Sequence, residues 1–269
     1  MTFLVACSDD KEAATPLDVV VTESGDRVNL EAPPSVKGGV VELSLTNSGQ
    51  GPHSLQFIKD TSGNHTIDDV VAFLGASEQG GPIPDWLGEG GGIGTVAPGQ
   101  TGRASFRLSE GKHFVWDDET DENDKNNGTR GGITELNVTS GSGGELPEAK
   151  GSVSAKEYEF TVNDLKPGAT TIQFENTGKE FHHFIAAPLL PGKTIADAKT
   201  FFESQGQGGG PPPIDFESGV GTAVLAPGNA LVADLQLEAG NYAMVCFINN
   251  RTGGPPHFTM GMLQEVKVA

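Results

Sequence analysis

The sequence repeats one set of landmarks at a nearly constant distance, and this repeat constrains the fold more than any other feature. His53 and His182 are 129 residues apart, each just beyond a strand pattern that ends in Asn. Pro98-Gly99 and Pro227-Gly228 keep the same offset. A repeat of this length indicates two copies of one domain rather than one large fold.

Each copy is predicted to combine short strands with one short helix. Thr66 and Thr194 precede apolar helical patterns, and each is followed three residues later by a carboxylate that completes a capping box. The strand patterns alternate apolar and polar residues, as in 158–162, 169–174, 230–237, 242–246 and 263–268. These features predict an all-β chain of two tandem Greek-key β-sandwiches, each with one inserted helix.

A Gly- and Ser-rich stretch separates the two copies and predicts a linker at 141–149. The first sandwich is then expected at 17–140 and the second at 150–269. Residues 1–16 form a polar tether behind a short apolar start.

The N-terminal residues Leu4-Val5-Ala6-Cys7 resemble a bacterial lipobox, in which the cysteine is the lipidated first residue of the mature protein. We therefore expect a lipoprotein anchored at Cys7 on the outer side of the cytoplasmic membrane. The alternative is a chance match of four residues. The sequence has no run of 18 apolar residues, so membrane contact is expected through the lipid alone.

The chain carries a formal net charge of −19, with a pI near 4.5. Such a charge argues against a nucleic-acid partner, because few cations are available to neutralise phosphates. Any partner attracted by charge would be basic. A surface that is simply soluble explains the same composition.

Four residues of the second copy could bind one metal ion: His182, Cys246, His257 and Met262. The first comes from an early strand, and the other three lie close to the last strand pair. Two imidazoles, one thiolate and a weak thioether form a set that accommodates both copper oxidation states.

This pattern resembles the cupredoxin family of blue-copper proteins. The resemblance covers the whole second copy and is carried by the Asn-rich turn 176–182, the aromatic-x-x-x-Cys strand 242–246 and the His-x4-Met segment 257–262. It implies one type 1 copper, electron transfer and a redox partner protein. A metal-free binding or structural protein and a copper delivery or storage protein remain as alternatives.

Two ligand assignments stay open, and one loop departs from the family. His183 neighbours His182 but is expected to face the other way. Met260 competes with Met262, which we prefer because of its spacing. Ten residues separate Cys246 from His257, whereas small blue-copper proteins have shorter loops there.

The first copy lacks the corresponding donors. Asp117 stands where Cys246 stands in the second copy, and Gly132 or Ile133 replaces Met262. The first copy is therefore expected to hold no metal. The sequence also lacks hydrolase, metalloprotease and phosphate-loop motifs. Because a closed copper site leaves no place for a substrate, we expect that the chain is not an enzyme.

Overall fold

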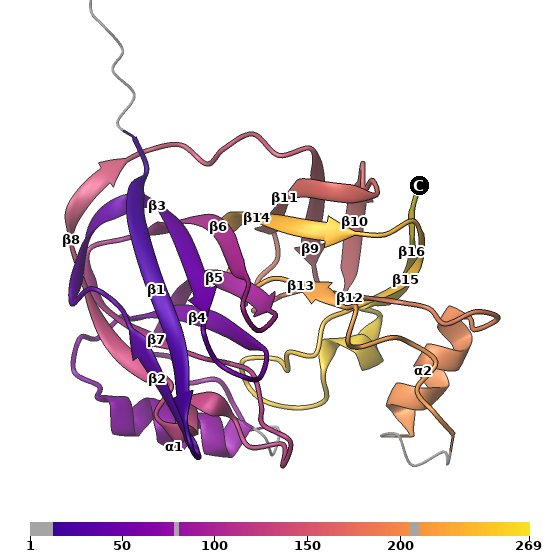
Figure 1. Cartoon of the computed structure of the whole chain (residues 1–269), viewed down its shortest axis with the longest axis horizontal. Coiled ribbons are helices and arrows are strands. Elements are labelled where there is room, and N and C mark those ends of the chain that lie inside the picture. The colour runs from indigo at the N-terminus through magenta and orange to yellow at the C-terminus, as the bar shows by residue number, and fades with distance from the viewer. Residues whose placement is uncertain (1–12, 78–80, 205–209) are drawn as a thin grey trace, which may run out of the picture.

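The computed structural model describes residues 13–77, 81–204 and 210–269, and in it the chain is almost entirely β-structure (Figure 1). The strands of the N-terminal half are β1 (Thr15–Ser24), β2 (Arg27–Glu31), β3 (Ser35–Asn47), β4 (His53–Asp60), β5 (Leu87–Val96), β6 (Thr101–Leu108), β7 (Gly111–Trp116) and β8 (Ile133–Gly143). The strands of the C-terminal half are β9 (Gly151–Lys156), β10 (Glu159–Asn163), β11 (Gly168–Asn176), β12 (Ile185–Pro188), β13 (Val220–Gly221), β14 (Ala230–Leu237), β15 (Gly240–Val245) and β16 (Leu263–Val268). The prediction of an all-β sandwich fold is confirmed.

Among the described residues each half contains one α-helix where the sequence predicts it, α1 (Ile67–Ser77) and α2 (Ile195–Glu203). The Thr194 hydroxyl accepts from the backbone N–H of Asp197, whose carboxylate accepts from the backbone N–H of Thr194, so the predicted capping box is formed. Neither helix in the described part of the chain is long and apolar enough to cross a membrane.

The C-terminal half is a sandwich of two four-stranded layers. One layer has the order β10-β9-β11-β14 and the other β13-β12-β15-β16. Phe174 of β11 meets Phe184, beside β12, in an edge-to-face contact with ring centroids 5.4 Å apart. Both side chains are fully buried, so this contact lies in the core between the layers.

The two halves share one continuous sheet, which the sequence pattern does not predict. Strand β14 of the C-terminal half pairs antiparallel with β6 of the N-terminal half, with Leu231 opposite Phe106 and Ala233 opposite Ala104. Figure 1 shows this junction at the middle of the molecule. The segment after β13 also approaches β5, where a Cβ on Gly90 would lie 2.6 Å from the Val224 carbonyl oxygen. Gly90 has a φ of +117°, a value that glycine adopts without steric cost.

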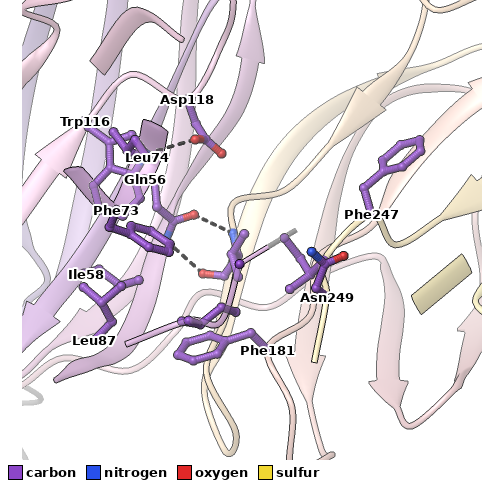
Figure 2. Close-up of a pocket in the computed structure, with 14 residues that line it drawn as sticks. Gln56, Ile58, Phe73, Leu74, Leu87, Trp116, Asp118, Phe181, Phe247 and Asn249 are labelled. Atoms are coloured by element: carbon purple, nitrogen blue, oxygen red, sulfur yellow. Dashed lines mark hydrogen bonds between the residues drawn. The ribbon is translucent and has the colours of Figure 1, made fainter. Parts of the chain in front are cut away.

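The side chain of Gln56 joins the two halves. Its Oε1 accepts from the backbone N–H of Val224 at 2.7 Å, and its Nε2 donates to the Val224 carbonyl at 3.0 Å. Figure 2 shows these bonds beside an apolar cavity of about 200 Å³ that lies between the halves. Phe73 and Trp116 of the N-terminal half and Phe181 and Phe247 of the C-terminal half are among its lining residues.

We expect Gln56→Leu to lower the free energy of unfolding by about 1–3 kcal/mol, because it leaves the polar groups of Val224 without partners. Denaturant unfolding followed by circular dichroism measures this. The matched control is Gln100→Leu, which changes an exposed side chain and is expected to alter stability by less than about 0.5 kcal/mol. Equal stability of the two variants would contradict the role of Gln56.

Candidate metal centre

Three of the four predicted ligands come together in the C-terminal half. Nδ1 of His182 lies 3.1 Å from Nδ1 of His257, and Sγ of Cys246 lies 3.9 Å and 3.6 Å from these two nitrogens. All three side chains are fully buried. Two nitrogens and one sulfur bound to one metal at ~2.0–2.3 Å would stand roughly 3.3–3.8 Å apart. The donor atoms therefore fit a single metal ion.

His182 is positioned by the Asn-rich turn that follows β11. The Asn176 side chain donates to the carbonyls of Glu180 and Leu225, both at 2.8 Å, and accepts from the backbone N–H of Gly178 at 3.0 Å. His182 and Leu225 then exchange two backbone hydrogen bonds. The turn is thus held at both ends, and it directs the imidazole inward.

Cys246 and His257 are brought together by the chain that closes behind β15. Backbone N–H groups of Cys246 and Met262 donate to the carbonyls of Met262 and His257, both at 3.1 Å. His257 begins a 3₁₀ helix, His257–Met260, and Gly261 follows it with a φ of +133°. A Cβ on Gly261 would lie 2.8 Å from the Tyr158 carbonyl oxygen, so only glycine fits this turn.

The long loop between Cys246 and His257 returns on itself, as the site requires. The backbone N–H of His257 donates to Ile248 at 2.9 Å, and Gly253 donates to Asn250 at 2.7 Å. Arg251 fastens the loop to the N-terminal half by donating to the carbonyls of Pro84, Asp85 and Leu87. The insertion is therefore compatible with a closed His–Cys–His group.

Burial determines the protonation of the donors before a metal binds. It raises the pKa of the Cys246 thiol to about 12. Burial, reinforced by the neighbouring His182, lowers the pKa of His257 to about 4. Burial also lowers the pKa of His182, against the opposing effect of Glu157. At neutral pH the site thus holds one protonated thiol and two neutral imidazoles.

The remaining candidate residues lie in different places. Met262 is fully buried in the same core cluster as Cys246, whereas Met260 is partly exposed. His183 stays outside the group, and its Nε2 accepts from the backbone N–H of Phe247 at 3.0 Å. Cys7 lies outside the described residues.

Three side chains beside the group were not singled out in the sequence. Asn250 Oδ1 lies 3.0 Å from His257 Nε2 and accepts from the Tyr158 hydroxyl at 2.8 Å. A carboxylate oxygen of Glu157 lies 3.5 Å from His182 Nε2. No motif marks these residues, because each contact joins segments far apart in the chain or lies within the irregular loop.

The N-terminal half builds the same framework around other side chains. The backbone N–H of Asp117 donates to Gly132, as that of Cys246 does to Met262. Asn127 begins a 3₁₀ helix at the place of His257. The Asp117 carboxylate bonds to Nδ1 of His53 and to the Asn127 amide, so polar side chains fill the position of a metal. In the described residues the His182–Cys246–His257 group is the one convergence of three such donors.

No protein-family model matches the sequence, and no curated protein matches it. Solved structures do match in fold. A multicopper oxidase crystal structure shares 15% identity, with 94% of this chain and 88% of that chain covered and a TM-score of 0.26. Copper nitrite reductase from Nitrosomonas europaea shares 13% identity, with 94% of both chains covered and a TM-score of 0.25. Reduced auracyanin from Roseiflexus castenholzii shares 21% identity, with 44% of this chain and 94% of that chain covered and a TM-score of 0.29.

These matches correct one expectation from the sequence. The chain was expected not to be an enzyme, yet proteins titled as an oxidase and a nitrite reductase are among its structural neighbours. That expectation is therefore wrong, because one fold can carry several activities and this fold is also found in proteins titled as enzymes. The chain itself has the cupredoxin-like all-β fold, with a buried His–Cys–His group in its C-terminal half whose donor chemistry supports copper.

Proposed function

We propose that the chain binds one type 1 copper ion in its C-terminal half and transfers electrons. The supporting observation is the convergence of Nδ1 of His182, Sγ of Cys246 and Nδ1 of His257 within 4.8 Å of one another. Met262, which is buried and joined to Cys246 by a backbone hydrogen bond, would supply a weak thioether as a fourth ligand. Copper in such a site cycles between two oxidation states that differ by one electron.

The protein's contribution is a donor set that is assembled before the metal arrives. Asn176 holds the turn that carries His182, and backbone bonds hold Cys246 and His257 at fixed separation. The donors are enclosed in the core, so their side chains have little freedom to move. Little rearrangement is then needed when one electron is gained or lost.

We further propose where the protein is anchored, how its domains are arranged and what kind of partner it has. Cys7, within the N-terminal segment 1–16, would carry the lipid that anchors the chain outside the cytoplasmic membrane. The rest of that segment would serve as a tether. The first sandwich, predicted at 17–140, would hold no metal, and the second, predicted at 150–269, would bind the copper. Strand β8 continues to Gly143, so only the later part of the predicted linker 141–149 would connect them. The net charge of −19 favours a basic redox partner.

Copper reconstitution tests the proposal. Adding Cu(II) to purified protein is expected to produce an intense visible absorption that saturates at one copper per chain and bleaches reversibly on reduction. Bound copper without a reversible redox couple would indicate delivery or storage instead. A protein that binds no copper and leaves Cys246 unchanged in a thiol titration would be a metal-free binding protein.

Copper affinity is expected to rise about tenfold per pH unit between about pH 6 and 8. Since burial raises the pKa of Cys246 to about 12 and lowers that of His257 to about 4, only the thiol must lose a proton in this range. Competition titrations with a chelator of known proton affinity measure the slope. A pH-independent affinity would show that the thiolate is not a ligand.

A further inference from the structure

The turn between β9 and β10 lies against both histidines of the metal centre. Its two residues, Glu157 and Tyr158, each face one of the imidazoles. The contacts involve the outer side of each ring, since the Nδ1 atoms point toward Cys246. This short turn therefore contacts both rings on the side away from Nδ1, the nitrogen that could bind a metal.

Tyr158 acts on His257 through Asn250. The Tyr158 hydroxyl donates to Asn250 Oδ1 at 2.8 Å, and the same oxygen lies 3.0 Å from His257 Nε2. Because an amide oxygen only accepts, His257 must carry its hydrogen on Nε2, which leaves the Nδ1 lone pair free toward Cys246. The Tyr158 ring also packs against the His257 ring, with centroids 5.1 Å apart.

Glu157 places a carboxylate beside the outer nitrogen of His182. Nε2 of His182 is buried and has no hydrogen-bond partner among the described residues, and the Glu157 carboxylate lies 3.5 Å away. That carboxylate is held in place by the backbone N–H groups of Lys179 and Glu180. A fixed anion beside this nitrogen favours the hydrogen on Nε2 and the lone pair on Nδ1.

The N-terminal half keeps one part of this arrangement and lacks the other. Glu23 accepts from the backbone N–H groups of Gln50 and Gly51 and lies 3.7 Å from His53 Nε2. Ser24 follows Glu23 where Tyr158 follows Glu157, and Asn127 stands at the place of His257. The carboxylate thus accepts hydrogen bonds from a neighbouring turn in both halves. The tyrosine–asparagine pair is found only beside His257.

We infer that Glu157, Tyr158 and Asn250 are positioning residues of the metal centre: they hold both imidazoles in the tautomer that presents Nδ1, and the Glu157 charge sets the reduction potential. This inference rests on the proposed copper function. An anion near the metal stabilises Cu(II) more than Cu(I), because the oxidised ion carries the larger positive charge. Removing that anion therefore raises the potential.

Reduction potentials of Glu157→Gln and Glu23→Gln test the electrostatic part. The amide keeps an acceptor for the two backbone N–H groups while removing the charge. We expect Glu157→Gln to shift the Cu(I)-to-Cu(II) affinity ratio about tenfold toward Cu(I), which is about +59 mV for one electron. Glu23→Gln should leave the potential unchanged. An unchanged potential in Glu157→Gln, or equal shifts in both variants, would overturn the role of Glu157.

Asn250→Ala and Tyr158→Phe test the positioning of His257. Copper affinity is expected to fall about 10–100-fold in Asn250→Ala and less in Tyr158→Phe, which keeps the ring. In the metal-free protein, ¹⁵N NMR should show His257 protonated on Nε2, with a mixture of tautomers in Asn250→Ala. Protonation on Nδ1 in the wild type would overturn the inference even if copper binds. A wild type that binds no copper would overturn the proposed function as well.

Discussion

Cys246→Ser is expected to abolish the intense visible absorption of the copper-loaded protein and to weaken copper binding by more than about a hundredfold. Changes in the surroundings of metal ligands cost about 10–100-fold in affinity, and loss of the ligand itself should cost more. The Cys246 thiol is fully buried between two imidazole nitrogens, and no other cysteine lies in the described residues. Serine preserves the size of the side chain but is a poor copper ligand.

Cys7→Ser is the matched control, because these two residues are the only cysteines in the sequence. Its absorption and copper stoichiometry should equal those of the wild type. Absorption spectra and equilibrium dialysis of both variants provide the measurement. A blue Cys246→Ser protein, or loss of colour in Cys7→Ser alone, would place the thiolate ligand elsewhere.

Asn176→Ala is expected to lower the free energy of unfolding by about 2–4 kcal/mol and to weaken copper binding at the same time. The substitution leaves the Glu180 carbonyl without its donor and the backbone N–H of Gly178 without its acceptor. The Leu225 carbonyl loses one of its two donors and keeps the backbone N–H of His182. Each buried polar group left unpaired costs about 1–3 kcal/mol. His182 loses its fixed position because the same turn carries it.

Asn47→Ala separates these two effects. Asn47 makes the equivalent bonds in the N-terminal half, donating to the carbonyls of Gly51 and Val96 and accepting from the backbone N–H of Gly49. Denaturant unfolding should show a similar loss of stability, while copper titration without denaturant should match the wild type. If Asn47→Ala lost copper as Asn176→Ala does, the turn would act through overall stability rather than through His182.

Local sequence signals predicted much of the fold. The Thr194 cap predicted the start of α2, and the alternating pattern of 230–237 matches β14 as the structure has it. The pairing of β14 with β6 could not be predicted, because both partners are ordinary alternating strands and nothing local specifies the neighbour. The two halves consequently share a sheet that the sequence presents as two separate sandwiches.

The candidate site was predictable where chemistry and spacing coincide in the sequence. His182, Cys246 and His257 stand out because histidine and cysteine are rare in this sequence and because these three residues lie close to predicted strands. Asn250 and Tyr158 do not stand out, since their contact joins residues 92 positions apart, one of them in an irregular loop. The expectation that the chain is not an enzyme failed for another reason, because a fold does not specify an activity.

His182, Cys246 and His257 are the three residues proposed to hold one copper ion. X-ray absorption at the copper edge, on protein reconstituted to one copper per chain, tests this assignment most directly. We expect a metal shell of one sulfur and two imidazole nitrogens in the wild type, with the sulfur absent in Cys246→Ser. A shell of nitrogen and oxygen alone in the wild type, or no bound copper after reconstitution, would contradict it.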